Sequence, residues 1–353
     1  MTAEPPPPGL TDHTGSAGRT GRADRTGSAG RTGSAGRTGS AGRTGSAGHD
    51  ELAGRVSLVT GATGGMGRVI ATELARRGSA VVAVTRSQGS GDKLREYVAS
   101  QVQADRVEVL VADLASRDDL HGVAEGFMAR HGALHLLINN AGAHYRERRV
   151  DERGVEMHVA VNHLAGFTLS GLLLGALRAA GPARVINVVS ATMGDTRQVK
   201  ILPRPRPVDL DPDALDDLRD VNPADGFEPF SAYARAKLLT LMSGYHLAEE
   251  LRGTGVTVNA VHPGLVATPI IGDIAPGVAR PFLPLIRRSL LTPAEGAASA
   301  LWLATAADLE TTTGRYFNRT TEAVSPAVSY DRGLQQRVWA ASARGLSIDL
   351  GWR

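Results

Sequence analysis

The 353-residue sequence contains no cysteine, which excludes disulfides, thiol nucleophiles and cysteine-ligated metal sites. Its ten histidines show no HExxH or other metal-ligand spacing, so we expect no metal. No apolar run is long enough to cross a membrane, and the nearest, residues 164–177, has polar interruptions that indicate a buried helix. The N-terminus lacks the basic and then apolar pattern of a signal segment. These absences predict a soluble, cytoplasmic protein.

The charge is nearly balanced. The formal net charge is +3, and the first fifty residues alone carry six arginines against four acidic residues. The rest of the chain therefore has no basic surplus to attract nucleic acid, which we exclude as a partner. Residues 25–48 are four copies of RTGSAG, a flexible composition without large apolar side chains. We predict a disordered tail over 1–51, with an arginine-bearing tether for an acidic partner as the alternative, and one folded domain over 52–353.

From residue 52 onward, short runs rich in Val, Ile and Leu alternate with helical patterns. The predicted strands are residues 55–60, 80–85, 107–112, 134–140, 184–190, 256–261 and 315–318. Continuous apolar strands separated by helices are typical of a parallel sheet that is covered on both faces. We therefore predict the α/β class, as a doubly wound, Rossmann-type parallel sheet of about seven strands in a single domain. Ligands of such a fold bind beyond the carboxyl ends of the strands.

The first strand is joined to the first helix by TGATGGMG, residues 60–67. Gly61, Gly65 and Gly67 would let the backbone turn tightly and approach a pyrophosphate at the helix N-terminus. The second strand ends in Thr85 and Arg86, with no acidic residue to hold a ribose diol. An arginine here suits a 2′-phosphate, so the sequence predicts NADP(H) in preference to NAD(H). A solvated arginine and a plain glycine turn are the alternatives.

Tyr233 and Lys237 are four residues apart in FSAYARAKLLT, residues 230–240. In a helix this spacing makes them neighbours, and an ammonium beside a phenol lowers the pKa of the phenol. The pair would then serve as an acid and base near neutral pH. The spacing alone is also compatible with two side chains that share a helix face by chance.

Seven motifs, taken in order, resemble those of the short-chain dehydrogenase/reductase family from about residue 54 almost to the C-terminus. The motifs are TGATGGMG (60–67), ADL (112–114), NNAG (139–142), VNHLAGF (161–167), NVVS (187–190), YARAK (233–237) and HPGLVATP (262–269). Within the family, the body is most similar to the retinol-dehydrogenase-like and protochlorophyllide-reductase-like branch. That branch generally uses NADP and lipophilic substrates.

The resemblance implies two sets of site residues. The catalytic set is Asn162, Ser190, Tyr233 and Lys237. The cofactor-binding set is Gly61, Thr63, Gly64, Gly65, Met66, Gly67, Arg86, Asp113, Leu114, Asn140, Ala141, Gly142, Tyr233, Lys237, Pro263, Gly264, Val266 and Thr268. Asp113 would face the adenine amine, while Val266 and Thr268 would hold the nicotinamide carboxamide.

The implied reaction is hydride transfer between the nicotinamide and a carbonyl carbon. Ser190 and Tyr233 would hydrogen-bond the oxygen on which charge develops, and Tyr233 would exchange the proton. Lys237 would lower the pKa of Tyr233 and hold the nicotinamide ribose. Asn162 would anchor a water that relays protons to Lys237. The histidines near this set, His158, His163 and His262, are expected to pack or to act through their backbone.

Two segments depart from the shorter family members. Ser190 precedes Tyr233 by 43 residues, and the added stretch, 195–230, is rich in proline and acidic residues. It is either a lid over the substrate, which we favour, or a surface loop. Residues 271–293 are predicted to cover the substrate, and their apolar side chains indicate a bulky lipophilic ligand. Two arginines behind them, Arg287 and Arg288, are too few to favour contact with a membrane surface.

The sequence therefore predicts an NADP(H)-dependent oxidoreductase that interconverts a carbonyl and an alcohol on a lipophilic small molecule. The alternatives are an enzyme of the same fold and cofactor that isomerises or eliminates without net redox change, and a non-catalytic NADP-binding protein. High Ala, Arg and Gly usage indicates a GC-rich bacterial genome, where such enzymes often tailor secondary metabolites. The apolar helix that follows Tyr233 would either pair with its copy in a homodimer or be buried within the monomer.

Overall fold

Strands of the predicted parallel sheet run through the centre of the structure, a computed structural model that describes residues 51–194, 208–267 and 288–346. The strands are β1 Val56–Thr60, β2 Ala80–Thr85, β3 Val107–Val111, β4 Leu136–Asn139, β5 Ala183–Val188, β6 Val256–His262, β7 Tyr316–Asn318 and β8 Thr321–Glu322. Their order in the sheet is β3-β2-β1-β4-β5-β6-β7-β8. All neighbouring pairs are parallel except β7 and β8. The Rossmann-type prediction is confirmed, and the described ranges contain eight strands of the sheet where about seven were expected.

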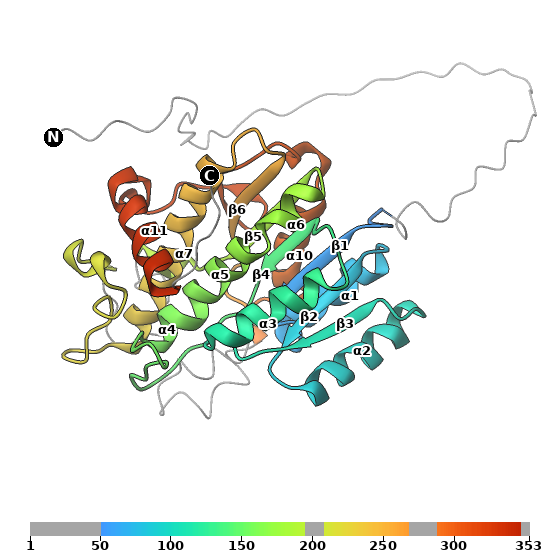
Figure 1. Cartoon of the computed structure of the whole chain (residues 1–353), viewed down its shortest axis with the longest axis horizontal. Coiled ribbons are helices and arrows are strands. Elements are labelled where there is room, and N and C mark those ends of the chain that lie inside the picture. The colour runs from blue at the N-terminus through green and yellow to red at the C-terminus, as the bar shows by residue number, and fades with distance from the viewer. Residues whose placement is uncertain (1–50, 195–207, 268–287, 347–353) are drawn as a thin grey trace, which may run out of the picture. The chain divides into compact units, whose positions relative to one another are not determined.

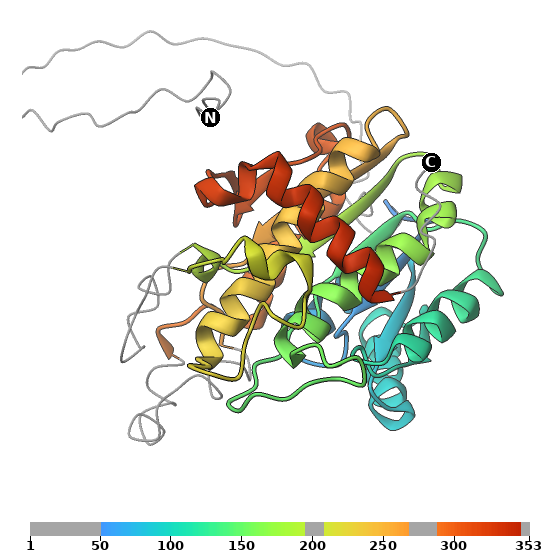
Figure 2. The same ribbon diagram turned by 60° about the vertical axis from the view of Figure 1, so that its left-hand side comes forward.

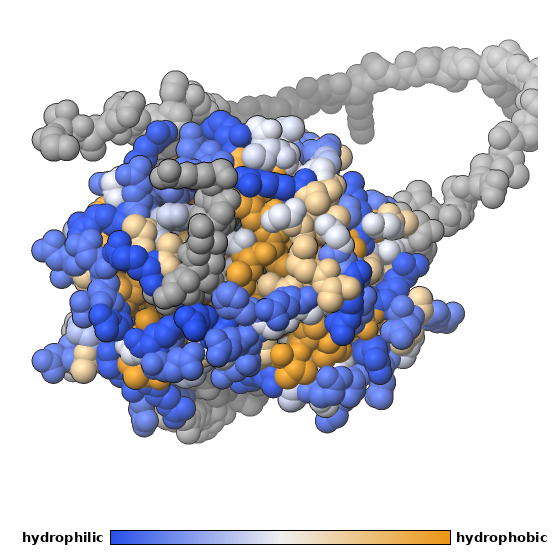
Figure 3. All heavy atoms as spheres, viewed as in Figure 1, coloured by the Kyte–Doolittle hydropathy of each residue, from blue (hydrophilic) through white to orange (hydrophobic). Residues whose placement is uncertain are grey.

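Helices cover both faces of the sheet (Figure 1). They are α1 Gly65–Arg76, α2 Gln88–Val102, α3 Arg117–Met128, α4 Met157–Val159, α5 Ala165–Leu172, α6 Leu174–Ala179, α7 Pro229–Glu250, α10 Pro293–Thr305 and α11 Arg332–Leu346. One face packs against α1, α2 and α10, and the other against α3, α5 and α7. Figure 3 shows that hydrophobic side chains gather over the central helices of the second face, with hydrophilic ones around them.

The central strands are buried on both faces because helices cover both faces. Every residue of β4 and β6 is buried, whereas Val111 at the end of the edge strand β3 is exposed. The strand order reverses between β1 and β4, which lie side by side in the middle of the sheet. In doubly wound folds the ligand crevice lies at this switch point, beyond the carboxyl ends of the strands.

Local capping fixes where the two helices beside this crevice begin. The side chain of Glu228 accepts hydrogen bonds from the backbone N–H groups of Phe230 and Ser231, and Pro229 occupies the first turn of α7. Thr292 and Glu295 form a reciprocal capping box at the start of α10. Tyr233 and Lys237 therefore lie on the first turns of a helix with a well-defined start.

The apolar side of α7 is covered by α11, which lies across it in Figure 2. Val338 and Ala341 of α11 are buried in a cluster with Leu238 and Leu241 of α7. The Trp339 ring also lies 4.8 Å from that of His246, between ring centroids. Of the two explanations offered for the apolar pattern of α7, burial within the chain is the one observed.

The described part of the insertion, residues 208–230, packs onto the body through Leu210, Leu215, Leu218 and Val221, which are all buried. It contains a 3₁₀ turn, Asp213–Asp216, which is tied to α11 by an ion pair of 3.0 Å between Asp216 and Arg337. Residues 195–207 of the predicted lid lie outside the described residues. So do 271–287 of the predicted substrate cover.

Candidate active site

A cavity of about 570 Å³ opens beyond the carboxyl ends of the strands. Residues that follow β1, β2, β3, β4, β5 and β6 all line it, together with Tyr233 and Lys237 from α7. The cavity brings together the predicted cofactor residues that the structure describes. These are Gly61, Thr63, Gly64, Gly65, Met66, Gly67, Arg86, Asp113, Leu114, Asn140, Ala141, Gly142, Tyr233, Lys237, Pro263, Gly264 and Val266. Thr268 lies outside the described residues.

The glycine-rich turn leaves no room for a side chain at Gly61 and Gly67. Gly61 and Gly65 have φ of +64° and +50°, a region that favours glycine. A Cβ on Gly67 would lie 2.1 Å from the carbonyl oxygen of Gly61. The Asn140 side chain donates to the carbonyl of Thr60 at 3.0 Å, which locks the turn against the segment after β4. No side chain caps the start of α1, so its first amides remain available for an anion such as a pyrophosphate.

At the far end of the cavity, Thr85 is buried and Arg86 is exposed at the rim. The Thr85 hydroxyl donates to the carbonyl of Ser87 at 3.1 Å. Asp113 accepts from the backbone N–H of Ala115 at 3.0 Å. The rim thus carries one positive side chain and no acidic residue at the end of β2.

Tyr233 and Lys237 lie on the same side of α7, and the Lys237 Nζ is 5.9 Å from the centroid of the Tyr233 ring. The ammonium donates a hydrogen bond of 2.9 Å to the carbonyl of Val188 at the end of β5. Burial lowers the pKa of Lys237 to about 8 and raises the pKa of Tyr233 to about 12. We predicted that Lys237 lowers the pKa of Tyr233. In the structure burial raises that pKa, and its lowering by Lys237 stays a prediction.

Ser190 lines the cavity directly after β5. It caps a 3₁₀ turn, Ala191–Met193, by accepting from the backbone N–H of Thr192 at 3.3 Å. Its hydroxyl also shares a hydrogen bond of 2.8 Å with the Thr192 hydroxyl. Ser190 therefore caps this turn and lies in the cavity with Tyr233.

Asn162 lies behind the cavity wall, in a π-helical stretch, Ala160–Leu164, between α4 and α5. Its Oδ1 accepts from the backbone N–H of Ala143 at 2.9 Å, and its Nδ2 donates to the Ala143 carbonyl at 3.0 Å. Its own carbonyl accepts from the Thr240 hydroxyl at 2.8 Å. The side chain of Asn162 thus holds the segment after β4, a role that sequence reasoning did not foresee.

We expected the histidines near the site to pack or to act through their backbone, but the cavity lining includes two histidines. His144 lines the cavity, and its ring lies 6.2 Å from the Tyr233 ring, between centroids. Burial and the neighbouring His158 lower the pKa of His144 to about 4, so its ring is neutral at physiological pH. His262 also lines the cavity, and burial lowers its pKa to about 4. The backbone carbonyl of His262 accepts from the backbone N–H of Arg319 at 2.8 Å. The backbone of His262 thus makes a structural hydrogen bond while the residue also lines the cavity.

In the described ranges, no group of three or more His, Asp or Glu side chains is arranged to hold a metal ion. In the same ranges, no helix has the length and apolarity that a membrane span requires.

Comparison with known proteins gives consistent results. A family model described as short chain dehydrogenase matches residues 55–200. The chain is 35% identical to polyprenol dehydrogenase from Danio rerio over 304 residues, which are 83% of this chain and 86% of that protein. It is 36% identical to retinol dehydrogenase 12 from Bos taurus over 305 residues, 84% of this chain and 88% of that protein.

Solved structures show the same fold. A crystal structure of an uncharacterized protein from Mycobacterium paratuberculosis superposes with a TM-score of 0.64 and 25% identity, covering 85% of this chain and 96% of that one. L-sorbose reductase from Gluconobacter frateurii gives a TM-score of 0.58 at 20% identity, covering 77% and 96%.

Proposed function

The chain belongs to the short-chain dehydrogenase/reductase family, an oxidoreductase family, and from this premise we propose that it interconverts a carbonyl and an alcohol on a lipophilic small molecule with NADP(H). One observation carries the proposal. A single cavity collects the glycine-rich turn at one end of the site and Ser190, Tyr233 and Lys237 at the other. A cofactor that spans the switch point would end beside an acid–base pair.

The nicotinamide, when bound, supplies or accepts the hydride. The turn at Gly61–Gly67 and the first amides of α1 would hold the pyrophosphate. Asp113 and Leu114 would contact the adenine, and Asn140–Gly142 the adjoining ribose. Pro263, Gly264, Val266 and Thr268 would hold the carboxamide, and Arg86 the 2′-phosphate that distinguishes NADP from NAD.

Ser190 and Tyr233 would hydrogen-bond the substrate oxygen, where negative charge develops during reduction. The raised pKa of Tyr233 keeps its phenol protonated at neutral pH, which suits donation of a proton to that oxygen. Lys237, held by the carbonyl of Val188, would contact the nicotinamide ribose. Asn162 would anchor a water that relays protons to Lys237, while its side chain holds Ala143.

Two observations support a lipophilic substrate. The lining of the cavity includes the apolar residues Met157, Val161, Val189 and Phe230, and the Phe230 ring stacks against that of Tyr233. The similar proteins are named for polyprenol and retinol, both long apolar alcohols.

The test begins with fluorescence titrations with NADPH and NADH, followed by assays of NADPH consumption with retinal and other apolar aldehydes and ketones. Tighter binding of NADPH and its consumption with a carbonyl would support the proposal. Conversion of substrate without net NADPH consumption would favour an isomerase or eliminase. Binding without any conversion would favour a non-catalytic NADP-binding protein.

A further inference from the structure

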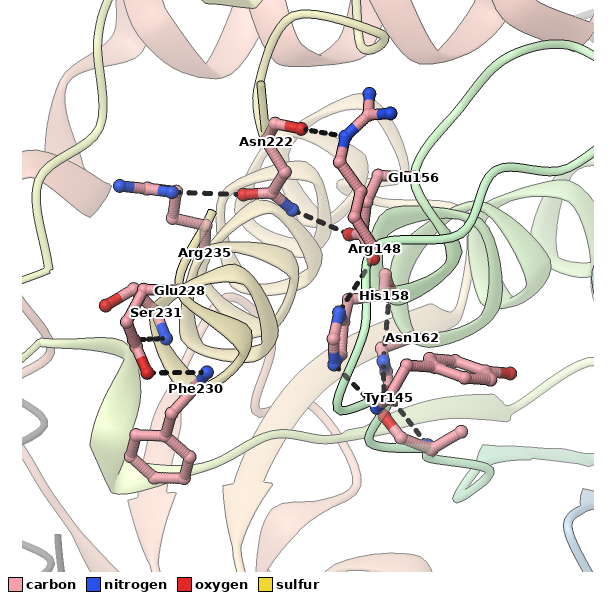
Figure 4. A network of polar contacts seen from close by, with 11 residues as sticks. Tyr145, Arg148, Glu156, His158, Asn162, Asn222, Glu228, Phe230, Ser231 and Arg235 are labelled. Atoms are coloured by element: carbon pink, nitrogen blue, oxygen red, sulfur yellow. Dashed lines mark hydrogen bonds and ion pairs between the residues drawn. The ribbon is translucent and has the colours of Figure 1, made fainter. Parts of the chain in front are cut away.

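A chain of buried polar side chains runs from the cavity wall to the insertion (Figure 4). His158 and Glu156 are joined by a hydrogen bond of 2.8 Å between Nδ1 and Oε1. The other oxygen of Glu156 accepts from Nδ2 of Asn222, also at 2.8 Å. Glu156 and His158 are 0% exposed, and Asn222 is 1% exposed. A carboxylate this deeply buried needs hydrogen-bond partners for its charge, and His158 and Asn222 supply them.

The hydrogen bonds fix the protonation of each group. The backbone N–H of Tyr145 points at Nε2 of His158 at 3.0 Å, and an N–H can only donate. Nε2 is therefore the acceptor and the ring proton lies on Nδ1, from which His158 donates a hydrogen bond to the carboxylate of Glu156. Burial alone would raise the pKa of Glu156, but the hydrogen bonds from His158 and Asn222 outweigh burial and lower it.

Two side chains bind the backbone of the wall segment Ala143–Tyr145, which continues the predicted cofactor segment Asn140–Gly142. Asn162 binds the N–H and the carbonyl of Ala143, and His158 binds the N–H of Tyr145. These two residues are also linked to each other, because the Asn162 side chain donates to the backbone carbonyl of His158 at 3.0 Å. Figure 4 shows both on the same side of this segment.

The other end of the chain reaches the catalytic helix. Oδ1 of Asn222 accepts from Arg235 at 3.1 Å, and Arg235 lies two residues after Tyr233 on α7. Arg235 also donates to the carbonyl of Asp209 at 2.8 Å, within the insertion. The backbone carbonyl of Asn222 accepts from Arg148 at 2.9 Å. Asn222 therefore joins the wall and the helix that carries Tyr233.

We propose that Glu156, His158 and Asn222 are positioning residues, which keep the wall Ala143–Tyr145 at a fixed position relative to Tyr233 across the cavity. The described part of the insertion then acts as a fixed brace between the two sides of the site. This inference rests on the proposed function, because it concerns the alignment of cofactor and substrate with Tyr233. Misplacement of reacting groups lowers turnover even where binding is retained.

The pattern of donors and acceptors allows a compensation test. In Glu156→Gln, the new amide N–H group faces the N–H group of Asn222. If the side-chain amide of Asn222 rotates so that its oxygen accepts from the new amide, the N–H group of Asn222 then faces the guanidinium of Arg235, and two donors oppose each other there. In Asn222→Asp, a second carboxylate faces Glu156 within the buried chain. In the double variant, Gln donates to Asp and Arg235 donates to its other oxygen, so every group regains a partner and the total charge is unchanged.

The experiment measures kcat and KM for an apolar carbonyl, the Kd for NADPH and the melting temperature for the wild type and these variants. Each single variant should lose at least ~10-fold in kcat, and the double variant should return to within ~3-fold of the wild type. The Kd for NADPH should change less than kcat. Ser57→Ala, which removes a buried hydrogen bond to Ser79 on the far side of the sheet, is the matched control and should lower stability without lowering kcat.

Three outcomes would overturn the inference. Wild-type kcat in both single variants would show that the chain does not position the site. Recovery of the melting temperature without recovery of kcat in the double variant would show a merely structural role. Absence of turnover by the wild type with any carbonyl would overturn the proposed function, and this inference with it, whereas the first two outcomes leave the proposed function intact.

Discussion

Lys237 lies 5.9 Å from the centre of the Tyr233 ring, and its hydrogen bond goes to the backbone at the end of β5 instead of to the phenol. In this arrangement burial controls both groups. The pKa of the tyrosine rises to about 12 and that of the lysine falls to about 8. The protein's own residues therefore prepare a protonated phenol, which favours proton donation during reduction.

Replacement of Tyr233 by Phe removes the proposed proton donor and keeps the ring that packs beside Phe230. We expect kcat to fall by about 10²- to 10⁴-fold, the usual contribution of general acid–base catalysis, with little change in NADPH affinity. Tyr245→Phe is the control, because it removes a partly buried hydroxyl from the same helix away from the cavity. A Tyr233→Phe enzyme with most of its turnover would contradict the proposed mechanism.

The lowered pKa of Lys237 predicts a pH dependence. The charged ammonium is the form proposed to hold the ribose, and it loses its proton as the pH rises through about 8. The value of kcat/KM for NADPH, which reports on the free protein, should therefore decline above about pH 8. A profile that stays level up to about pH 10 would show that the charge of Lys237 does not matter for cofactor capture.

Arg86 at the cavity rim should determine the choice between the two cofactors. A charge-assisted hydrogen bond to a phosphate contributes about 1.5–3 kcal/mol, so Arg86→Ala should weaken NADPH binding about 10- to 100-fold and leave NADH binding unchanged. Arg95→Ala removes the same charge from the exposed side of α2 and should change neither affinity. Equal losses for both cofactors in Arg86→Ala would contradict recognition of the 2′-phosphate.

These residues were accessible to sequence reasoning because each lies in a short local pattern. A glycine-rich turn after an apolar strand and a Tyr–Lys pair at helical spacing can be identified without knowing the fold. The strand positions followed from runs of Val, Ile and Leu. By contrast β8 has only two residues, Thr321 and Glu322, both exposed, and nothing in their sequence marks a strand.

The positioning residues Glu156, His158 and Asn222 were not predictable in the same way. Glu156 and Asn222 are 66 residues apart in sequence, and their contact exists only once the insertion has folded against the wall. His158 was expected to pack, and its burial is consistent with that, but no local pattern indicated that it would bind the backbone of Tyr145. The burial that raises the pKa of Tyr233 was not predictable for a similar reason, since it depends on the whole fold.

The covered face of α7 predicts the state of assembly. Because α11 occupies the apolar side of α7, that helix is not available to pair with a second copy. We expect light scattering to give the mass of one chain, 36.9 kDa, at micromolar concentration. A dimer mass would contradict this expectation and would show that another surface forms the interface.

His163 predicts how stability depends on pH. It is 1% exposed, and its Nε2 is 2.8 Å from the hydroxyl of Ser342. That hydroxyl donates its own proton to the carbonyl of Val338, so Nε2 of His163 must be the donor. Its Nδ1 is then an unprotonated, buried nitrogen without a hydrogen-bond partner. Protonation there would bury an unpaired charge, and burial accordingly lowers the pKa of His163 to about 3.

A histidine in the unfolded chain titrates near its ordinary value of 6.5. Between that pH and about 3 the unfolded state binds a proton that the folded state does not, so acid favours unfolding. The stability that neutral His163 contributes is complete above pH 6.5 and is lost by up to about 1.4 kcal/mol per pH unit as the pH falls. His163→Gln keeps a donor for Ser342 but cannot titrate. Its free energy of unfolding, measured by urea denaturation, should fall less steeply than that of the wild type between pH 6.5 and 5.

His121→Gln serves as the control, because it replaces a histidine on α3 that is only partly buried and leaves His163 in place. It should follow the steeper wild-type dependence. His144 and His262, whose lowered pKa values also make acid destabilising, are present in all three proteins, so the difference between the two variants isolates His163. Parallel curves for His163→Gln and the wild type would mean that the His163 site accepts a proton in the folded state.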